Sequence, residues 1–126
     1  MDVLRPFAVI DASSVELEVE TVPDDQSVRG EPTTGWRSLG TALGLEVGVW
    51  EMSTGAMTDM EVDEIFVVIS GEATVTLIVD EQPTEVIDLR PGSICRLPEG
   101  AHTLWEVTRT VRKVVLLRAG EQDAGA

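Results

Sequence analysis

Short runs of alternating or apolar residues, separated by turn-forming residues, restrict the fold of this chain more than any other feature. The clearest run is Val15–Val22, in which valine and leucine alternate with glutamate. Such alternation puts apolar side chains on one face of a strand and charged side chains on the other. Similar runs recur about every 8–12 residues, with Gly, Pro and Asp between them. This pattern predicts an all-β sandwich or barrel.

The predicted strands follow one another along most of the chain. Glu64–Ser70 is apolar on both faces, which is typical of an interior strand, and Gly71-Glu72 is interpreted as a tight turn after it. Pro23–Gly35 has the composition of a loop. The remaining predicted strands are Leu43–Met52, Ala73–Val79, Thr84–Leu89, Ser93–Pro98, Thr103–Val107 and Arg112–Arg118.

The length of 126 residues fits a single domain. We expect its core to span about residues 43–118. Residues 1–42 should add N-terminal strands and a loop that pack on this core, and residues 119–126 should form a flexible tail.

The charge balance restricts the possible partners. The formal net charge is −14, with nine Lys and Arg residues, so the chain cannot easily form the basic face that nucleic acid or an anionic membrane requires. No apolar run is long enough for a membrane span, and the N-terminus does not resemble a signal peptide. The single cysteine, Cys95, cannot form an internal disulfide, which agrees with a cytoplasmic location. A cationic or amine-bearing small molecule suits the negative field, although the acidity could serve solubility alone.

Two glycine-marked stretches carry a family resemblance. The first runs from Gly55, as a loop that leads into a strand, through Glu64-x6-Gly71, and the second is Gly92-x5-Pro98-x-Gly100. Together they resemble the two signature motifs of the cupin superfamily, which implies a double-stranded β-helix, or jelly-roll barrel.

Three further elements narrow the resemblance, which covers about residues 48–117. They are Gly48-Val49-Trp50-Glu51, Trp105-Glu106-Val107 and Arg112-Lys113. The chain is similar in these elements to small single-domain cupins related to ureidoglycine aminohydrolase and to the ethanolamine-utilization cupin.

The same resemblance bears on metal binding. Metal-binding cupins supply two histidines and a carboxylate from the first motif, and this chain keeps only the carboxylate, Glu64. The two histidine positions fall on Thr58 and Met60, or on Met57 and Asp59 if the loop is one residue longer.

The second motif of metal-binding cupins supplies a third histidine, and its position falls on Thr103. His102, the only histidine, is one residue early, and a one-residue offset in a strand turns a side chain to the opposite face. We therefore expect no complete metal site and no cofactor, because catalytic metal sites keep about three protein ligands. A divalent metal held by Glu64 and His102 is the less favoured alternative.

Glu64 is the candidate acid or base, because it begins an apolar strand and shares a face with Phe66. A solvated position at the strand start is the alternative, and Asp59–Glu64 as a whole has the composition of a solvated acidic loop. Trp105 is either an aromatic wall for a ligand or part of the core. The predicted ligand pocket comprises Asp59, Met60, Glu64, Phe66, His102, Thr103 and Trp105.

Three functions remain open at this point. The first is a small-molecule-binding cupin without catalysis. The second is an enzyme of nitrogen or amine metabolism that acts on a ureido or amino compound through Glu64. The third is a structural subunit with a filled barrel. Ile65, Val67 and Ile69 lie on the face opposite Glu64 and need cover, so a homodimer is also predicted.

Overall fold

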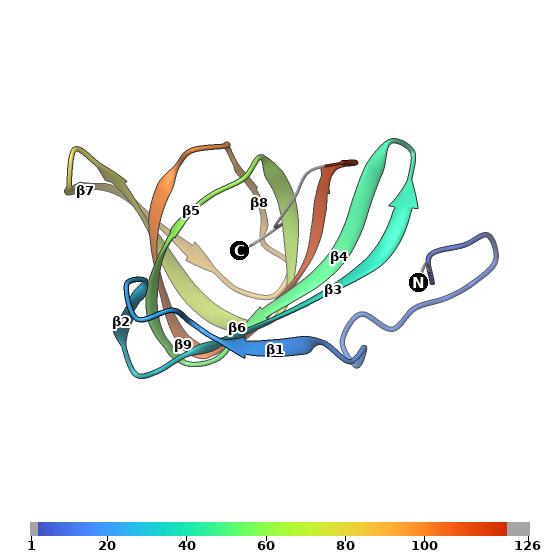
Figure 1. Ribbon diagram of the computed structural model, residues 1–126, viewed down its shortest axis with the longest axis horizontal. Helices are drawn as coiled ribbons and strands as arrows, with labels where there is room; N and C mark the ends of the chain where they lie inside the picture. Colours follow the sequence, from blue (N-terminus) through green and yellow to red (C-terminus); the bar gives the residue numbers. More distant parts are fainter. Residues whose placement is uncertain (1–2, 121–126) are drawn as a thin grey trace.

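The computed structural model describes residues 3–120, which form nine β-strands and no helix. All the strand pairings among these residues are antiparallel, and the sheet curls into a barrel (Figure 1). The predicted all-β class and the jelly-roll fold are thereby confirmed. The strands are β1 (Glu18–Thr21), β2 (Ser27–Arg29), β3 (Thr33–Ala42), β4 (Leu45–Met52), β5 (Gly55–Met60), β6 (Glu64–Val79), β7 (Gln82–Leu89), β8 (Ile94–Leu97) and β9 (His102–Arg118).

Two long strands, β6 and β9, connect the two halves of the barrel. The first half of β9 pairs with β5 on one side and with the second half of β6 on the other. Its second half pairs with β4 and with the first half of β6. The register between β6 and β9 is irregular between Val68 and Ala73, where both strands bend from one part of the sheet to the next.

Gly71 lies in this bend, and the predicted tight turn at Gly71-Glu72 is wrong. The chain continues through it as one strand, with Gly71 at φ +91°. A Cβ atom at Gly71 would overlap the carbonyl oxygen of Thr110 and lie 2.5 Å from the Cα atom of Val111. The glycine is therefore required by the close approach of β9 and by a backbone conformation that other residues rarely adopt.

Other segments also differ from their predicted structure for a common reason. The predicted strands Thr103–Val107 and Arg112–Arg118 are parts of one strand, β9, and the predicted loop Pro23–Gly35 contains β2 and the start of β3. The loop expected from Gly55 is the strand β5. In each case a neighbouring strand supplies hydrogen bonds that the local sequence does not reveal.

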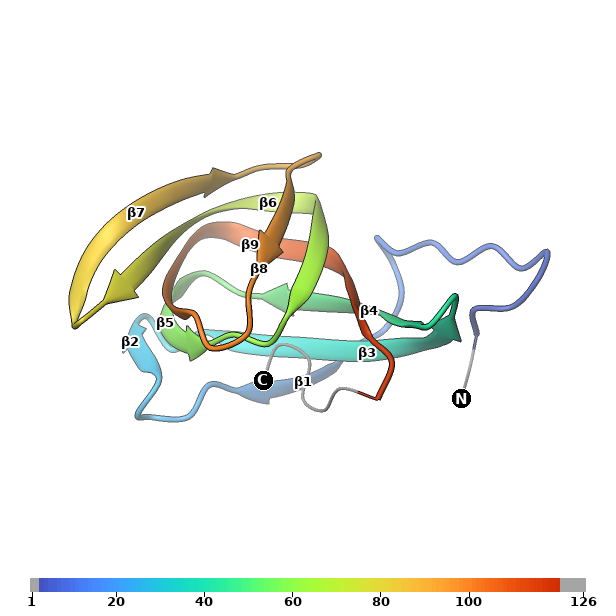
Figure 2. The ribbon, with the colours of Figure 1, turned by 90° about the horizontal axis from the view of Figure 1, so that it is seen from above.

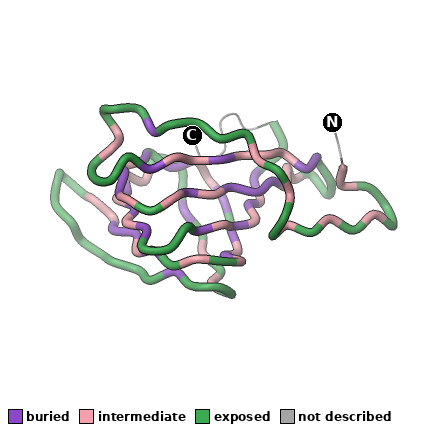
Figure 3. The backbone as a smooth tube through the Cα atoms, turned by 90° about the horizontal axis from the view of Figure 1, so that it is seen from below, coloured by how far each residue is buried: buried purple, intermediate pink, exposed green. Residues whose placement is uncertain are grey.

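Buried residues recur between less buried ones along the strands of the barrel (Figure 3), so the side chains of the core point to its inside. Its largest buried side chains include those of Trp105, Phe66 and Met52. By contrast, β7 pairs only with β6 and lies at one side of the molecule (Figures 1 and 2), with all its residues except Leu89 exposed. Most of the predicted flexible tail, residues 121–126, lies outside the described residues.

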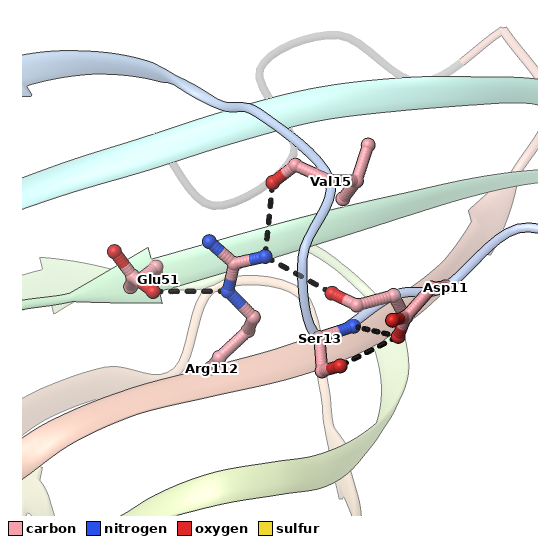
Figure 4. A network of polar contacts seen from close by, with 6 residues as sticks. Asp11, Ser13, Val15, Glu51 and Arg112 are labelled. Atoms are coloured by element: carbon pink, nitrogen blue, oxygen red, sulfur yellow. Dashed lines mark hydrogen bonds and ion pairs between the residues drawn. The ribbon is translucent and has the colours of Figure 1, made fainter.

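Arg112 fastens the N-terminal segment to the outer face of the barrel. Its Nε atom donates a hydrogen bond to Glu51 over 2.9 Å, and its Nη1 atom donates to the carbonyl oxygens of Ala12 and Val15, each over 3.0 Å (Figure 4). Asp11 accepts hydrogen bonds from the backbone and side chain of Ser13, which shapes the same segment. Residues 11–15 are thus held against β4 and β9.

Candidate functional site

The interior of the barrel contains a lysine. Beyond the bend in β9, every second side chain points inward, and Val111, Lys113, Val115 and Leu117 are between 0% and 2% exposed. Lys113 lies opposite Trp50 of β4 and Val68 of β6 in the strand register. Its position on the inner face leaves its ammonium group no route to solvent.

Lys113 forms an ion pair with Glu64, the first residue of β6. Its Nζ atom donates to the Oε1 atom of Glu64 over 2.8 Å, and neither side chain is more than 2% exposed. The face of β6 that carries Glu64 also carries Phe66 and Val68, which are both buried. The acid therefore lies inside the barrel, where it is already paired with a cation from the same chain.

Three aromatic rings surround the same ammonium group. The Nζ atom of Lys113 lies 4.1 Å from the ring centroid of Phe66, 4.5 Å from that of Trp50 and 4.7 Å from that of Trp105. We call these three rings and Glu64 the ammonium cage. Each ring presents its negative face to the cation, and such contacts strengthen when water is excluded.

The second carboxylate oxygen of Glu64, Oε2, is buried without a hydrogen-bond partner among the described residues. A buried carboxylate oxygen of this kind costs free energy, and the cost would be larger without the ion pair. The ammonium cage thus depends on Lys113 to keep the Glu64 charge inside the barrel.

A second buried carboxylate lies at the start of the β5–β6 connection. Glu61 is 5% exposed, and its Oε2 atom accepts hydrogen bonds from Thr103 Oγ1 over 2.6 Å and from Trp105 Nε1 over 3.1 Å. Thr103 and Trp105 share the inner face of β9. They hold the Glu61 carboxylate at this end of the barrel and satisfy one of its oxygens.

Asp59 adds a third buried carboxyl group. It lies on β5 opposite Thr103 and is 5% exposed. Burial and, to a smaller extent, the charge of Glu61 raise the pKa of Asp59 to about 8, although a hydrogen bond from the Met60 amide acts in the opposite direction. The Asp59 carboxyl is therefore protonated at neutral pH.

Asp59 borders a cavity of about 130 Å³ between β5 and the N-terminal strands. Two acids and one amide line this cavity, and no basic residue appears among its described lining. The lining residues are Glu20, Thr21, Val22, Pro23, Gln26, Thr34, Met57 and Asp59. The Gln26 side chain is held in place because it donates to the Thr58 carbonyl oxygen over 3.1 Å.

The raised pKa of Asp59 predicts a specific pH dependence of stability. Its unfolded-state pKa is 3.8, so between about pH 4 and pH 8 the native state keeps a proton that the unfolded state has lost. This contribution to stability is complete below pH 3.8 and is lost as the pH rises to about 8. Relative to the Asp59→Asn variant, we expect the free energy of unfolding to fall by up to about 1.4 kcal/mol per pH unit in this window.

Urea denaturation of the two proteins from pH 4 to pH 9 measures this difference. The Asp88→Asn variant is the matched control, because Asp88 is exposed on β7. The free energy of unfolding of this control should depend on pH with the same slope as that of the wild type. If Asp59→Asn also kept that slope, Asp59 would not hold a proton at neutral pH.

The structure brings five of the predicted pocket residues to the inner face of the barrel and places two elsewhere. The inner residues are Asp59, Glu64, Phe66, Thr103 and Trp105. Met60 points outward with 58% of its surface exposed, and it lies opposite His102 in the register of β5 and β9. His102 precedes the inward-facing Thr103, so alternation turns it to the outer face. Glu64 and His102 are not brought together.

The interpretation of Asp59–Glu64 as a solvated acidic loop is wrong, since Asp59, Glu61 and Glu64 are all nearly buried. Three residues around the buried charges, Trp50, Glu61 and Lys113, were not among the predicted pocket residues. Neither were Glu20 and Gln26, which line the cavity. The sequence does contain a signal for Lys113. This residue lies two positions after Val111 and two before Val115, so all three share one face of a strand, and a lysine on an apolar face must enter the core or disrupt it.

These residues do not fit a transition metal. Among residues 3–120, no group of three or more His, Cys, Asp or Glu side chains is placed to hold a metal ion. Glu64 is the one carboxylate that matches the metal-binding motif, and its Oε1 atom already accepts a hydrogen bond from the Lys113 ammonium.

Residues 3–120 contain no helical segment that could span a membrane.

Comparisons with known proteins agree with this architecture. The family model described as the EutQ-like cupin domain matches residues 42–114. No curated protein matches significantly. The solved structure of the Clostridium difficile EutQ protein is 22% identical, with a TM-score of 0.56 over 71% of this chain and 65% of that one.

Two other solved structures resemble the chain. A protein from Salmonella typhimurium named for ethanolamine utilization (EutQ) is 15% identical, with a TM-score of 0.58 over 86% of this chain and 99% of that one. A protein of unknown function of the DUF861 family from Pseudomonas syringae is 19% identical, with a TM-score of 0.69 over 87% of this chain and 47% of that one. At these identities the likeness concerns the fold alone.

Proposed function

Because this chain belongs to the EutQ-like cupin domain family, we propose that it is a small-molecule-binding cupin that takes an amine-bearing ligand beside Asp59. The observation that carries the proposal is the cavity of about 130 Å³ that Asp59 borders together with Glu20 and Gln26, without a basic residue in its described lining. A water molecule occupies about 30 Å³ in the liquid, so this space suits a ligand of a few non-hydrogen atoms.

The chemistry of the cavity favours a cation. A buried carboxyl group must keep a proton or find a positive partner, and no ion pair between described residues reaches Asp59. An ammonium group supplies both a positive charge and hydrogen-bond donors. The formal net charge of −14 also attracts cations to the molecule.

Calorimetric titration with ethanolamine tests the proposal, because one structural neighbour is named for ethanolamine utilization. We expect binding at pH 8.5 that weakens as the pH falls below about 8, since Asp59 must release its proton to pair with the ammonium. The Asp59→Asn variant should lose at least about tenfold in affinity, as expected for a charged hydrogen-bonding partner, whereas Asp88→Asn should bind like the wild type.

Ethylene glycol and acetate complete the design, since they match the ligand in size but are neutral and anionic. Neither should bind. Equal ethanolamine affinity in the wild type and in Asp59→Asn, or no binding at pH 8.5, would refute the proposed site.

A second candidate function is an enzyme that acts on a ureido or amino compound. The observation in its favour is again Asp59, because a pKa near 8 lies close to the operating pH that suits a general acid or base. Asp59 replaces Glu64 in this role, since the Glu64 side chain is fully buried and paired. Turnover of such compounds that disappears in Asp59→Asn and persists in Asp88→Asn would favour the enzyme over the binding protein.

A further inference from the structure

The ammonium cage has the composition of a ligand-binding site, although its occupant is part of the protein. Three aromatic rings from β4, β6 and β9 and one carboxylate meet around a single Nζ atom. We propose that the barrel interior is a binding site for a primary alkylammonium group, and that Lys113 is its resident occupant. This site is distinct from the Asp59 cavity and does not depend on the function proposed there.

The cage recognises the charge of the occupant as well as its shape. All three ring centroids lie within 4.7 Å of the nitrogen, which is inside the roughly 6 Å range of cation–π attraction. The Glu64 carboxylate adds a direct hydrogen bond at 2.8 Å. A neutral occupant of the same size would lose the cation–π attraction and the ion pair, and it would leave the Glu64 charge without a positive partner.

The alkyl part of the site is defined by the lysine side chain. Lys113 leaves β9 among the buried residues Val111 and Val115, and its methylene groups share their apolar surroundings. A Lys113→Ala substitution keeps the Cβ atom and removes three carbons and the ammonium nitrogen. The removed atoms match those of propylammonium, so this variant should contain an empty receptor for that ion.

Thermal unfolding of Lys113→Ala with added propylammonium chloride tests the proposal. We expect the variant to unfold well below the wild type, and about 50 mM propylammonium to raise its midpoint by about 5 °C more than the same concentration of sodium chloride. The fluorescence of the tryptophans should change on binding, because two of the three in the chain, Trp50 and Trp105, belong to the cage. The experiment is run at pH 6, where Asp59 keeps its proton and its cavity does not pair with an ammonium. The wild type, whose cage is full, should then show neither effect.

Propan-1-ol and propionate are the matched neutral and anionic probes. Neither should raise the midpoint of Lys113→Ala, and the Lys113→Ala/Glu64→Gln variant should no longer respond to propylammonium. The Lys113→Ala/Asp59→Asn variant should still respond, which separates this site from the Asp59 cavity. An equal response to propan-1-ol, or no response to propylammonium, would overturn the proposal.

Lys113→Ala could fail to fold at room temperature, and the test then becomes one of refolding. The urea-denatured variant is dialysed separately into three buffers, which contain propylammonium chloride, propan-1-ol or sodium chloride. Recovery of the β-sheet circular dichroism spectrum in propylammonium alone supports the proposal. No recovery in any buffer, or the same recovery in all three, contradicts it.

Discussion

The Lys113→Met variant is expected to lose about 3–5 kcal/mol of stability, the cost typical of breaking a buried ion pair from one side. Methionine keeps much of the length and apolar character of lysine but removes the charge. The variant would leave the Glu64 carboxylate inside the barrel without the 2.8 Å hydrogen bond and without the positive charge of the Lys113 ammonium. Urea denaturation at pH 7, compared with the wild type, measures the loss.

The Glu64→Leu/Lys113→Met variant separates the ion pair from packing. Replacing a whole buried pair by apolar residues of similar size is often neutral or stabilising, so this variant should recover most of the lost stability. If the double variant were as unstable as Lys113→Met, the loss would come from packing, and the cage would not depend on charge.

The Gly71→Ala variant is expected to lose about 4 kcal/mol of stability or more, a loss similar to that of Lys113→Met, because two penalties coincide. The new Cβ atom would overlap the backbone of Thr110 and Val111 in β9. The backbone of Gly71 also has φ +91°, which alanine rarely adopts. Backbone atoms of a paired strand cannot move aside as a flexible side chain can, so the bend shared by β6 and β9 would open.

Gly92→Ala is the matched control for Gly71→Ala. Gly92 has almost the same backbone angle, φ +94°, but a Cβ atom there would meet no atom within 4 Å. We expect a loss of about 1 kcal/mol from conformation alone. Urea denaturation of both variants isolates the steric part at Gly71. Equal losses would show that β9 does not approach as closely as described.

The fold could be predicted because its main signals are local. Alternation in runs such as Val15–Val22 and turn-forming residues between the runs are enough for an all-β chain, and the motifs around Glu64 and Gly92 resemble those of cupins. The sequence predicts a turn at Gly71, whereas the strand continues there through its pairing with β9. Local sequence contains no information on that partner.

The site was predicted only in part, because it depends on contacts between distant segments. Glu64 was recognised from its motif, but its partner Lys113 is 49 positions away. The direction of Asp59 depends on the register of β5 against β9, which the local sequence does not contain. The homodimer stays a prediction. Ile65, on the predicted contact face, is 42% exposed in the single chain.

The contact between Arg112 and residues 11–15 has a consequence for how this segment can vary. Two of the three groups that Arg112 binds are main-chain carbonyls, of Ala12 and Val15, and every amino acid presents such an oxygen. Replacing either side chain therefore leaves the anchor intact, whereas inserting or deleting one residue would shift the oxygens away from it. Natural selection should therefore restrict the length of this segment more strongly than the identity of its residues.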